Sequence, residues 1–172
     1  MIVGDCSKFA VEFELDKKYG GTWLYGKICY WIQNKRIGDY ELGTSLRDVL
    51  FQMRSIIGDR ANRFHQELFK LDAVHLYERL NNALFGYEDS QYSKISIEET
   101  WARFNVTIPV DVFDECKIFL VESKELSRFI IKDVKAANVY EVLLKDSQFD
   151  RIMAEAYDEL NRLYDLEVEN DS

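Results

Sequence analysis

The residue types that most often carry catalytic chemistry are sparse in this sequence. The chain has three cysteines and two histidines: Cys6, Cys29, Cys116, His65 and His75. The histidines are ten residues apart, so they lack the i,i+3 or i,i+4 spacing that places two metal ligands on one helix face. Cys6 has only Lys8 as a basic neighbour that could activate a thiol nucleophile. We therefore expect neither a metal site nor a cysteine nucleophile.

Adjacent carboxylates occur at four places: Glu88-Asp89, Glu98-Glu99, Asp114-Glu115 and Asp158-Glu159. Neighbouring residues point in different directions on a helix and to opposite faces of a strand, so none of these pairs forms an acid–base dyad. Nucleophile-elbow, phosphate-loop and dinucleotide-binding motifs are absent. We expect no catalytic residue and no cofactor. One alternative stays open: a small hydrolase or transferase whose site combines scattered residues such as Cys6, His65 and His75.

The charge balance favours a basic partner. Lys and Arg number 22 against 31 Asp and Glu, which gives a net charge of −9. Nucleic-acid binders need a basic surface, so we expect no nucleic-acid partner. The acids gather in two blocks: residues 86–115 hold seven acids and two bases, and residues 141–172 hold ten acids and three bases.

The first acidic block also carries aromatic residues of the kind that anchor protein interfaces. We expect it to be the surface that docks a basic protein, and its candidate residues are Tyr87, Glu88, Asp89, Tyr92, Asp111, Phe113, Asp114 and Glu115. The second block is expected to be the solvated face of a helix. The aromatic residues Trp23, Tyr25, Tyr30 and Trp31 are expected in the core rather than on a base-stacking surface.

Length and composition predict one domain spanning residues 1–172, with 47% hydrophobic residues available for a core. No apolar run approaches the ~20 residues that span a bilayer, and the N-terminus lacks the features of a signal peptide. An odd number of dispersed cysteines is typical of reduced, buried thiols. We expect a cytoplasmic protein without a membrane partner.

Hydrophobic periodicity predicts the elements. Residues 8–16 alternate as a half-buried strand and 26–33 form a second strand, which together make an N-terminal hairpin. Helices are predicted at 44–57, capped by Thr44, and at 72–86, capped by Asp72, and both should cover one face of the sheet.

Period-two patterns then predict strands at 101–108, 117–122 and 128–132. Residues 139–144 have a spacing that also fits a helix, but we favour one more strand because Asp146-Ser147 resembles a new helix start. A helix at about 147–166 carries an apolar stripe that should pack on the sheet. The fold class is α+β: an antiparallel sheet of about six strands, with helices inserted after the first hairpin and a long C-terminal helix.

The first forty residues resemble the start of a known family. The resemblance is carried by Met1-Ile2-Val3-Gly4-Asp5, the strand at Phe9-Ala10-Val11, Trp23, Gly26 and the turn that ends the second strand. Near the C-terminus, a Tyr-Glu-Val-Leu-Leu strand leads through Phe149-Asp150 into a long acidic helix. This plan is similar to immunity protein family forty-two, whose members accompany polymorphic and contact-dependent inhibition toxins.

The resemblance implies a non-enzymatic cytoplasmic antitoxin that binds and neutralises a cognate toxin domain. Many such toxins are nucleases with basic clefts, so clustered carboxylates would take the place of nucleic-acid phosphates. On this view Gly4-Asp5 is a turn that leads into the sheet. A further alternative is an acidic adaptor or nucleic-acid mimic that acts on host proteins.

Overall fold

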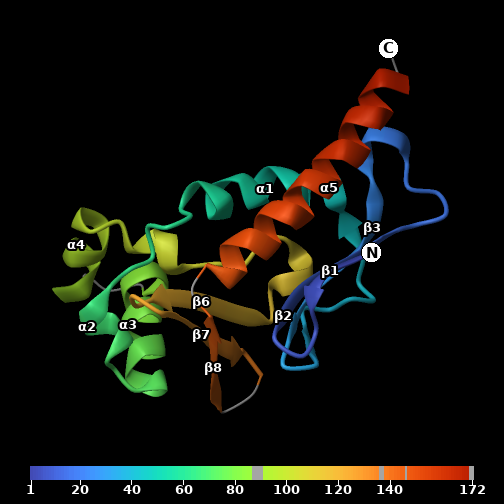
Figure 1. Cartoon of the computed structure of the whole chain (residues 1–172). Coiled ribbons are helices and arrows are strands. Elements are labelled where there is room, and N and C mark those ends of the chain that lie inside the picture. The colour runs from blue at the N-terminus through green and yellow to red at the C-terminus, as the bar shows by residue number, and fades with distance from the viewer. Residues whose placement is uncertain (87–90, 136–137, 146, 171–172) are drawn as a thin grey trace.

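The computed structural model describes residues 1–86, 91–135, 138–145 and 147–170. Two antiparallel sheets and a set of helices form an α+β fold (Figure 1). Sheet A has the order β1-β2-β3-β4, and β5 also pairs with β3. Its strands are β1 (Ile2–Asp5), β2 (Phe9–Leu15), β3 (Tyr25–Ile32), β4 (Lys35–Ile37) and β5 (Thr44–Ser45). Sheet B has the order β6-β7-β8, with β6 (Cys116–Glu122), β7 (Leu126–Asp133) and β8 (Val139–Lys145).

The opening Gly-Asp pair ends β1 and starts the turn into β2. Gly4 has φ +106° and pairs with Ala10, and a Cβ there would lie 2.6 Å from the Phe9 carbonyl oxygen. Only glycine fits this close approach without strain. The Asp5 carboxylate accepts hydrogen bonds from the Ser7 N–H and hydroxyl at 2.9 and 2.6 Å, and these bonds lower its pKa. The pair therefore has a structural role in the hairpin.

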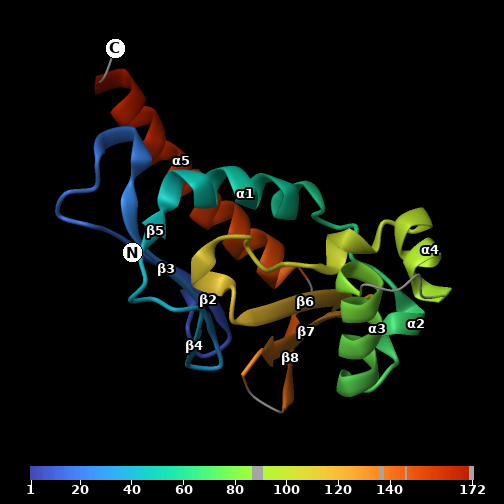
Figure 2. The same cartoon turned by 180° about the vertical axis from the view of Figure 1, so that it is seen from behind.

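The main core lies between the two sheets and the helices α1 (Leu46–Gly58) and α5 (Gln148–Asn170). Ser45 caps α1, because its hydroxyl accepts the Asp48 N–H. The inward residues of β2 pack there with buried positions of α5, including Phe9, Phe13, Phe149, Ile152 and Leu160. Figures 1 and 2 show α1 and α5 side by side, and the C-terminal end of α5 extends past sheet A.

A second core lies on the opposite face of sheet B. The short helices α2 (Gln66–Phe69), α3 (Ala73–Phe85) and α4 (Gln91–Glu98) gather there, with the 3-10 helix η2 (Trp101–Phe104). Phe119 and Ile130 of sheet B point into this cluster, whereas Ile118 and Ile131 point into the main core. Strands β6 and β7 are therefore buried on both faces, which explains their continuous apolar runs.

A buried ion pair joins the two cores. Arg63 is fully buried, and its Nη1 donates to Asp150 Oδ1 at 2.7 Å near the start of α5. Its Nε donates to the Arg103 carbonyl at 2.9 Å, and Nη2 bonds the Ile56 carbonyl. Asp150 also accepts the Ala61 N–H at 3.1 Å. These bonds hold the ends of α1, η2 and α5 together.

The sequence predicted the class, the antiparallel pairing, the inserted helices and the long last helix correctly. The single sheet that the sequence predicted is two separate sheets in the structure. The helices at 46–58 and 73–85 were predicted to cover one face of it, but they cover different sheets. The predicted strand at 101–108 is wrong over its first half, because residues 101–104 form η2. Strand β1, ahead of the predicted first strand, was missed. Among the described residues, no helix has both the length and the apolar character needed to cross a membrane.

Candidate functional site

The histidines and the accessible thiol lie in separate structural positions. His65 caps α2: its Nδ1 accepts the Leu68 N–H at 3.2 Å, and its Nε2 lies 3.1 Å from Glu99 Oε2. Hydrogen bonds from Trp101 and His65 lower the pKa of Glu99. His75 Nδ1 lies 2.5 Å from Asp72 at the start of α3. Cys6 lies in the β1–β2 turn of sheet A. The described hydrogen bonds of both histidines therefore involve carboxylates and a backbone N–H, not a thiol.

The predicted docking residues do not form one surface. Tyr87, Glu88 and Asp89 lie outside the described residues. Tyr92 is on α4, half-buried against the second core, with the Arg79 guanidinium 4.8 Å from its ring. Figure 2 shows α4 beside α2 and α3, at the end of the molecule away from β4.

The remaining predicted residues lie beside sheet A, in the 3-10 helix η3 (Asp111–Phe113) and just before β6. Asp111, Asp114 and Glu115 are exposed. Phe113 is 1% exposed, and its ring packs 5.0 Å from that of Tyr30. The expectation that Phe113 is a surface anchor does not agree with this burial, because the ring fills the main core against Tyr30.

The outer face of sheet A carries a denser set of polar and aromatic side chains. Alternation along β2 buries Val11 and Phe13 in the core and turns Glu12 and Glu14 outward. The register places Cys29 opposite Glu12 and Lys27 opposite Glu14 on β3, and Arg36 of β4 opposite Trp31. We call the set Glu12, Glu14, Lys27, Trp31, Arg36 and Tyr40 the outer cluster.

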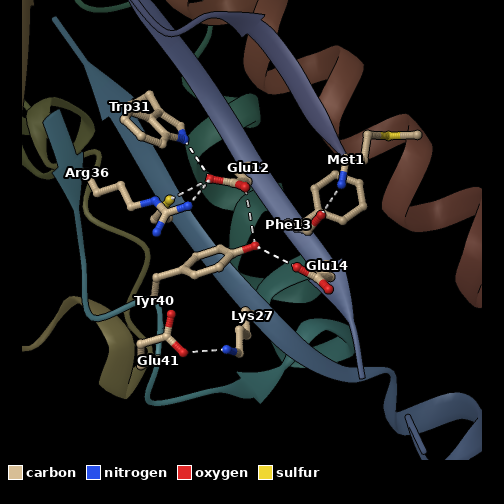
Figure 3. Close-up of polar contacts among 10 residues, drawn as sticks. Met1, Glu12, Phe13, Glu14, Lys27, Trp31, Arg36, Tyr40 and Glu41 are labelled. Carbon is tan, nitrogen blue, oxygen red and sulfur yellow. Dashed lines mark hydrogen bonds and ion pairs between the residues drawn. The ribbon is translucent and has the colours of Figure 1, made fainter. Parts of the chain in front are cut away.

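Glu12 is the centre of the outer cluster (Figure 3). Its side chain is 15% exposed and accepts the Trp31 indole N–H at 2.7 Å and an Arg36 N–H at 3.3 Å. The Tyr40 hydroxyl donates to Glu12 and Glu14 at 3.4 and 3.2 Å, and the Cys29 thiol lies 3.7 Å from Glu12. The carboxylate therefore fixes the orientation of an indole, a guanidinium and a phenol at once.

Aromatic and cationic groups stack above this carboxylate. The Arg36 guanidinium lies 4.4 Å from the Tyr40 ring centre and 5.0 Å from that of Trp31. Burial raises the pKa of Tyr40, and the neighbouring carboxylates raise it further, so the phenol stays a hydrogen-bond donor. Lys27 forms an ion pair with Glu41 at 2.5 Å, which raises the pKa of Lys27 and lowers that of Glu41.

A groove of about 600 Å³ lies next to the outer cluster, between the edges of the two sheets. One wall comes from β4 and the loop after it, and the other from β7, β8 and the start of β6. Figures 1 and 2 show the β3–β4 and β7–β8 hairpins projecting from the same side of the molecule. Arg36 belongs to both the outer cluster and the groove, and the predicted residue Glu115 lines the groove. The groove and the outer cluster therefore form one continuous candidate site.

The sequence contained part of the signal for this site. Alternation along 25–32 places Tyr30 in the core and Trp31 on the opposite face, although both were expected to be buried. Trp23 and Tyr25 are 45% and 44% exposed and stack with ring centres 6.0 Å apart. The contribution of Tyr40 has no periodic signal, because a loop carries it over the sheet.

This geometry describes a small α+β protein whose outer sheet face carries the aromatic and charged residues that are common in protein–protein interfaces. The chain belongs to the family Immunity protein 42, whose model matches residues 1–159. The crystal structure of CdiI from Burkholderia dolosa AUO158 has a similar fold, with a TM-score of 0.73 and 20% sequence identity. That similarity covers 92% of this chain and 99% of the CdiI chain. No curated protein sequence matches this chain.

Proposed function

We propose that this immunity protein is a cytoplasmic antitoxin, which binds the toxin domain encoded beside it and blocks that domain without chemistry of its own. Family membership supports the antitoxin role. The observation that carries the proposal is the outer cluster: the Trp31 and Arg36 side chains are held in place by a nearly buried carboxylate and by the buried Tyr40, on a sheet face that no described helix covers. Trp and Arg are among the residue types enriched at the hot spots of protein interfaces.

The toxin is a basic protein, and the proposed mechanism is occlusion of a nuclease cleft. The net charge of −9 supports electrostatic attraction to such a partner. Carboxylates around the groove, including Asp39 and Glu115, would occupy positions that nucleic-acid phosphates take in a basic cleft. Because Glu12 already orients the outer cluster, little side-chain entropy is lost when a partner covers it.

The test uses the toxin domain encoded next to this protein's gene, inactivated at its catalytic residue. Calorimetry should detect a stoichiometric complex. The double variant Trp31→Ala/Arg36→Ala should bind about 30-fold more weakly, as expected for loss of a central hot spot.

The matched control is Trp23→Ala/Arg47→Ala. This pair is also a tryptophan under a guanidinium, with 3.6 Å between the Arg47 group and the Trp23 ring centre, but it lies outside the outer cluster. We expect its affinity to change less than about threefold, and thermal melting must show that both variants fold. A normal affinity for the Trp31/Arg36 variant, with a loss in the control, would contradict the proposed site.

A further inference from the structure

The groove between the sheets is lined by two strand edges as well as by residues of β6 and β7. Consecutive residues line it on both sides: 35–39 on and after β4, and 139–142 on β8. Because neighbouring residues of a strand point to opposite faces, a run of consecutive lining residues means that the strand edge itself faces the groove. Among the described strands, β4 pairs only with β3, and β8 pairs only with β7. Both edges can therefore accept a further strand.

The inner wall of the groove is apolar. Ile32 and Ile37 lie on the sheet A side, and Ile131 and Val142 lie on the sheet B side. Ile32, Ile131 and Val142 belong to the main core, so the groove is the place where that core reaches the surface between the sheets. Its volume of about 600 Å³ lies within the ~300–1,000 Å³ range of sites that enclose a ligand.

The rim of the groove is acidic. Four of its lining residues are acids, Asp39, Glu115, Asp133 and Glu141, and two are bases, Lys35 and Arg36. Ion pairs neutralise three of these six charges. Arg36 pairs with Glu12, Glu141 pairs with Arg128, and Glu115 pairs with the nearby Lys135.

Two carboxylates of the rim have no ion-pair partner among the described residues. Asp39 accepts the Glu41 N–H at 3.2 Å, and Asp133 accepts the Lys135 N–H at 2.8 Å. Glu115, Asp133 and Asp39 together raise the pKa of Lys135, which lies beside this rim. Lys35 lies across the groove, 5.0 Å from the Tyr140 ring centre.

We propose that this groove binds an extended segment of the toxin in which basic and apolar residues alternate. This inference rests on the proposed function and names the part of the partner that the site receives. The segment pairs as a strand with the β8 edge, its apolar side chains fill the wall at Val142 and Ile131, and its basic side chains reach Asp39 and Asp133. Backbone pairing supplies affinity, and the alternate side chains supply specificity.

The experiment uses the isolated immunity protein and a short synthetic peptide in which lysine and valine alternate. Amide resonances of β8 and β4 should shift on titration, and β8 amides should gain protection from hydrogen exchange. A peptide of the same composition that repeats Lys-Lys-Val-Val should bind more weakly, because it cannot place all of its valines on one side. A peptide of alternating glutamate and valine should not bind.

The charge requirement is tested by Asp39→Asn/Asp133→Asn. Each asparagine keeps the one side-chain oxygen that accepts a backbone N–H in its turn. We expect about a fivefold loss of affinity for the lysine peptide at low salt. The control Asp158→Asn/Asp165→Asn removes the same charge from α5, where both carboxylates lie outside the groove, and should leave binding unchanged.

The outcomes separate this inference from the proposed function. Absence of groove shifts, equal binding of the two lysine peptides, or equal loss in the two variants would overturn the groove assignment even if the toxin binds at the outer cluster. If the peptide binds in the groove but does not displace the toxin domain, the toxin does not supply the segment and the inference fails. The inference is supported if the alternating lysine–valine peptide displaces the toxin domain and the other two peptides do not.

Discussion

At the scale of single residues, Glu12 organises the outer face of sheet A, because the alternation along β2 turns its side chain outward. One carboxylate, 15% exposed, receives hydrogen bonds from Trp31, Arg36 and Tyr40. Water has limited access to such a group, so the bonds that it accepts, above all the 2.7 Å bond from Trp31, orient their donors. These three side chains are therefore ordered before any partner arrives.

The cysteines give a direct check on burial at this scale. Cys29 and Cys116 are 0% and 7% exposed, and burial raises the pKa of both thiols to about 12. At about pH 8 only roughly one thiol in 10⁴ would be ionised at each site. Iodoacetamide should therefore modify the native protein at the half-buried Cys6 alone, as read by mass spectrometry. Equal labelling of Cys29 before and after unfolding would contradict the structure.

The buried ion pair predicts a large loss of stability. Asp150→Ala should lower the free energy of unfolding by about 3–5 kcal/mol, because it leaves the fully buried Arg63 without its carboxylate. Chemical denaturation measures this loss. Asp158→Ala on the exposed side of the same helix is the control and should change stability by less than about 0.5 kcal/mol. A small effect at Asp150 would mean that water reaches Arg63.

At the scale of elements, α5 is the helix that fastens sheet A to the rest of the core. Its buried positions, among them Phe149, Ile152, Met153 and Leu160, face the sheet, and its acids lie mainly on the other side. The sequence predicted this helix because its apolar stripe repeats every three to four residues over many turns. The acidic block of residues 141–172 is thus largely the solvated face of an amphipathic helix.

The orientation of α5 is tested by two substitutions. Leu160→Ala should cost about 2–5 kcal/mol, because Leu160 is fully buried. Glu155→Ala should cost less than about 0.5 kcal/mol, since its ion pair with Arg151 lies on the surface. Urea unfolding of the two variants gives both values, and similar losses would mean that the helix faces the sheet differently.

Local patterns predicted most strands but not how they assemble. Residues 104, 106 and 108 are buried as alternation predicts, yet η2 replaces the start of that strand. The extended remainder is held by the Val106 N–H bond to Ile118 and by the Thr107 hydroxyl, not by a full ladder. The division into two sheets has no periodic signal, because the choice of strand partners depends on contacts distant in the chain. The groove follows from that division and could not be predicted.

At the scale of the whole molecule, the proposed inhibition depends on a binding surface and not on a reaction. The combined variant Cys6→Ser/His65→Asn/His75→Asn tests this assignment. Asparagine preserves the cap of α2 that His65 supplies, so the fold should persist. Cells that express the toxin should survive as well with this variant as with the parent protein. Loss of protection by a folded variant would favour the hydrolase or transferase alternative.

We propose that the toxin docks on the side of the outer cluster and the groove, and not on α5. The most direct test of this docking site is the association rate of the inactivated toxin domain at low and high salt. Two variants carry the same change in charge: Asp111→Lys/Asp114→Lys/Glu115→Lys beside the groove, and Glu155→Lys/Asp158→Lys/Glu159→Lys on α5. We expect the first variant to associate on the order of tenfold more slowly than the parent protein at low salt, and high salt to narrow this difference in rate. The association rate of the second variant should change little. The opposite result, in which the toxin associates slowly with the α5 variant and at the normal rate with the groove variant, would contradict this docking site.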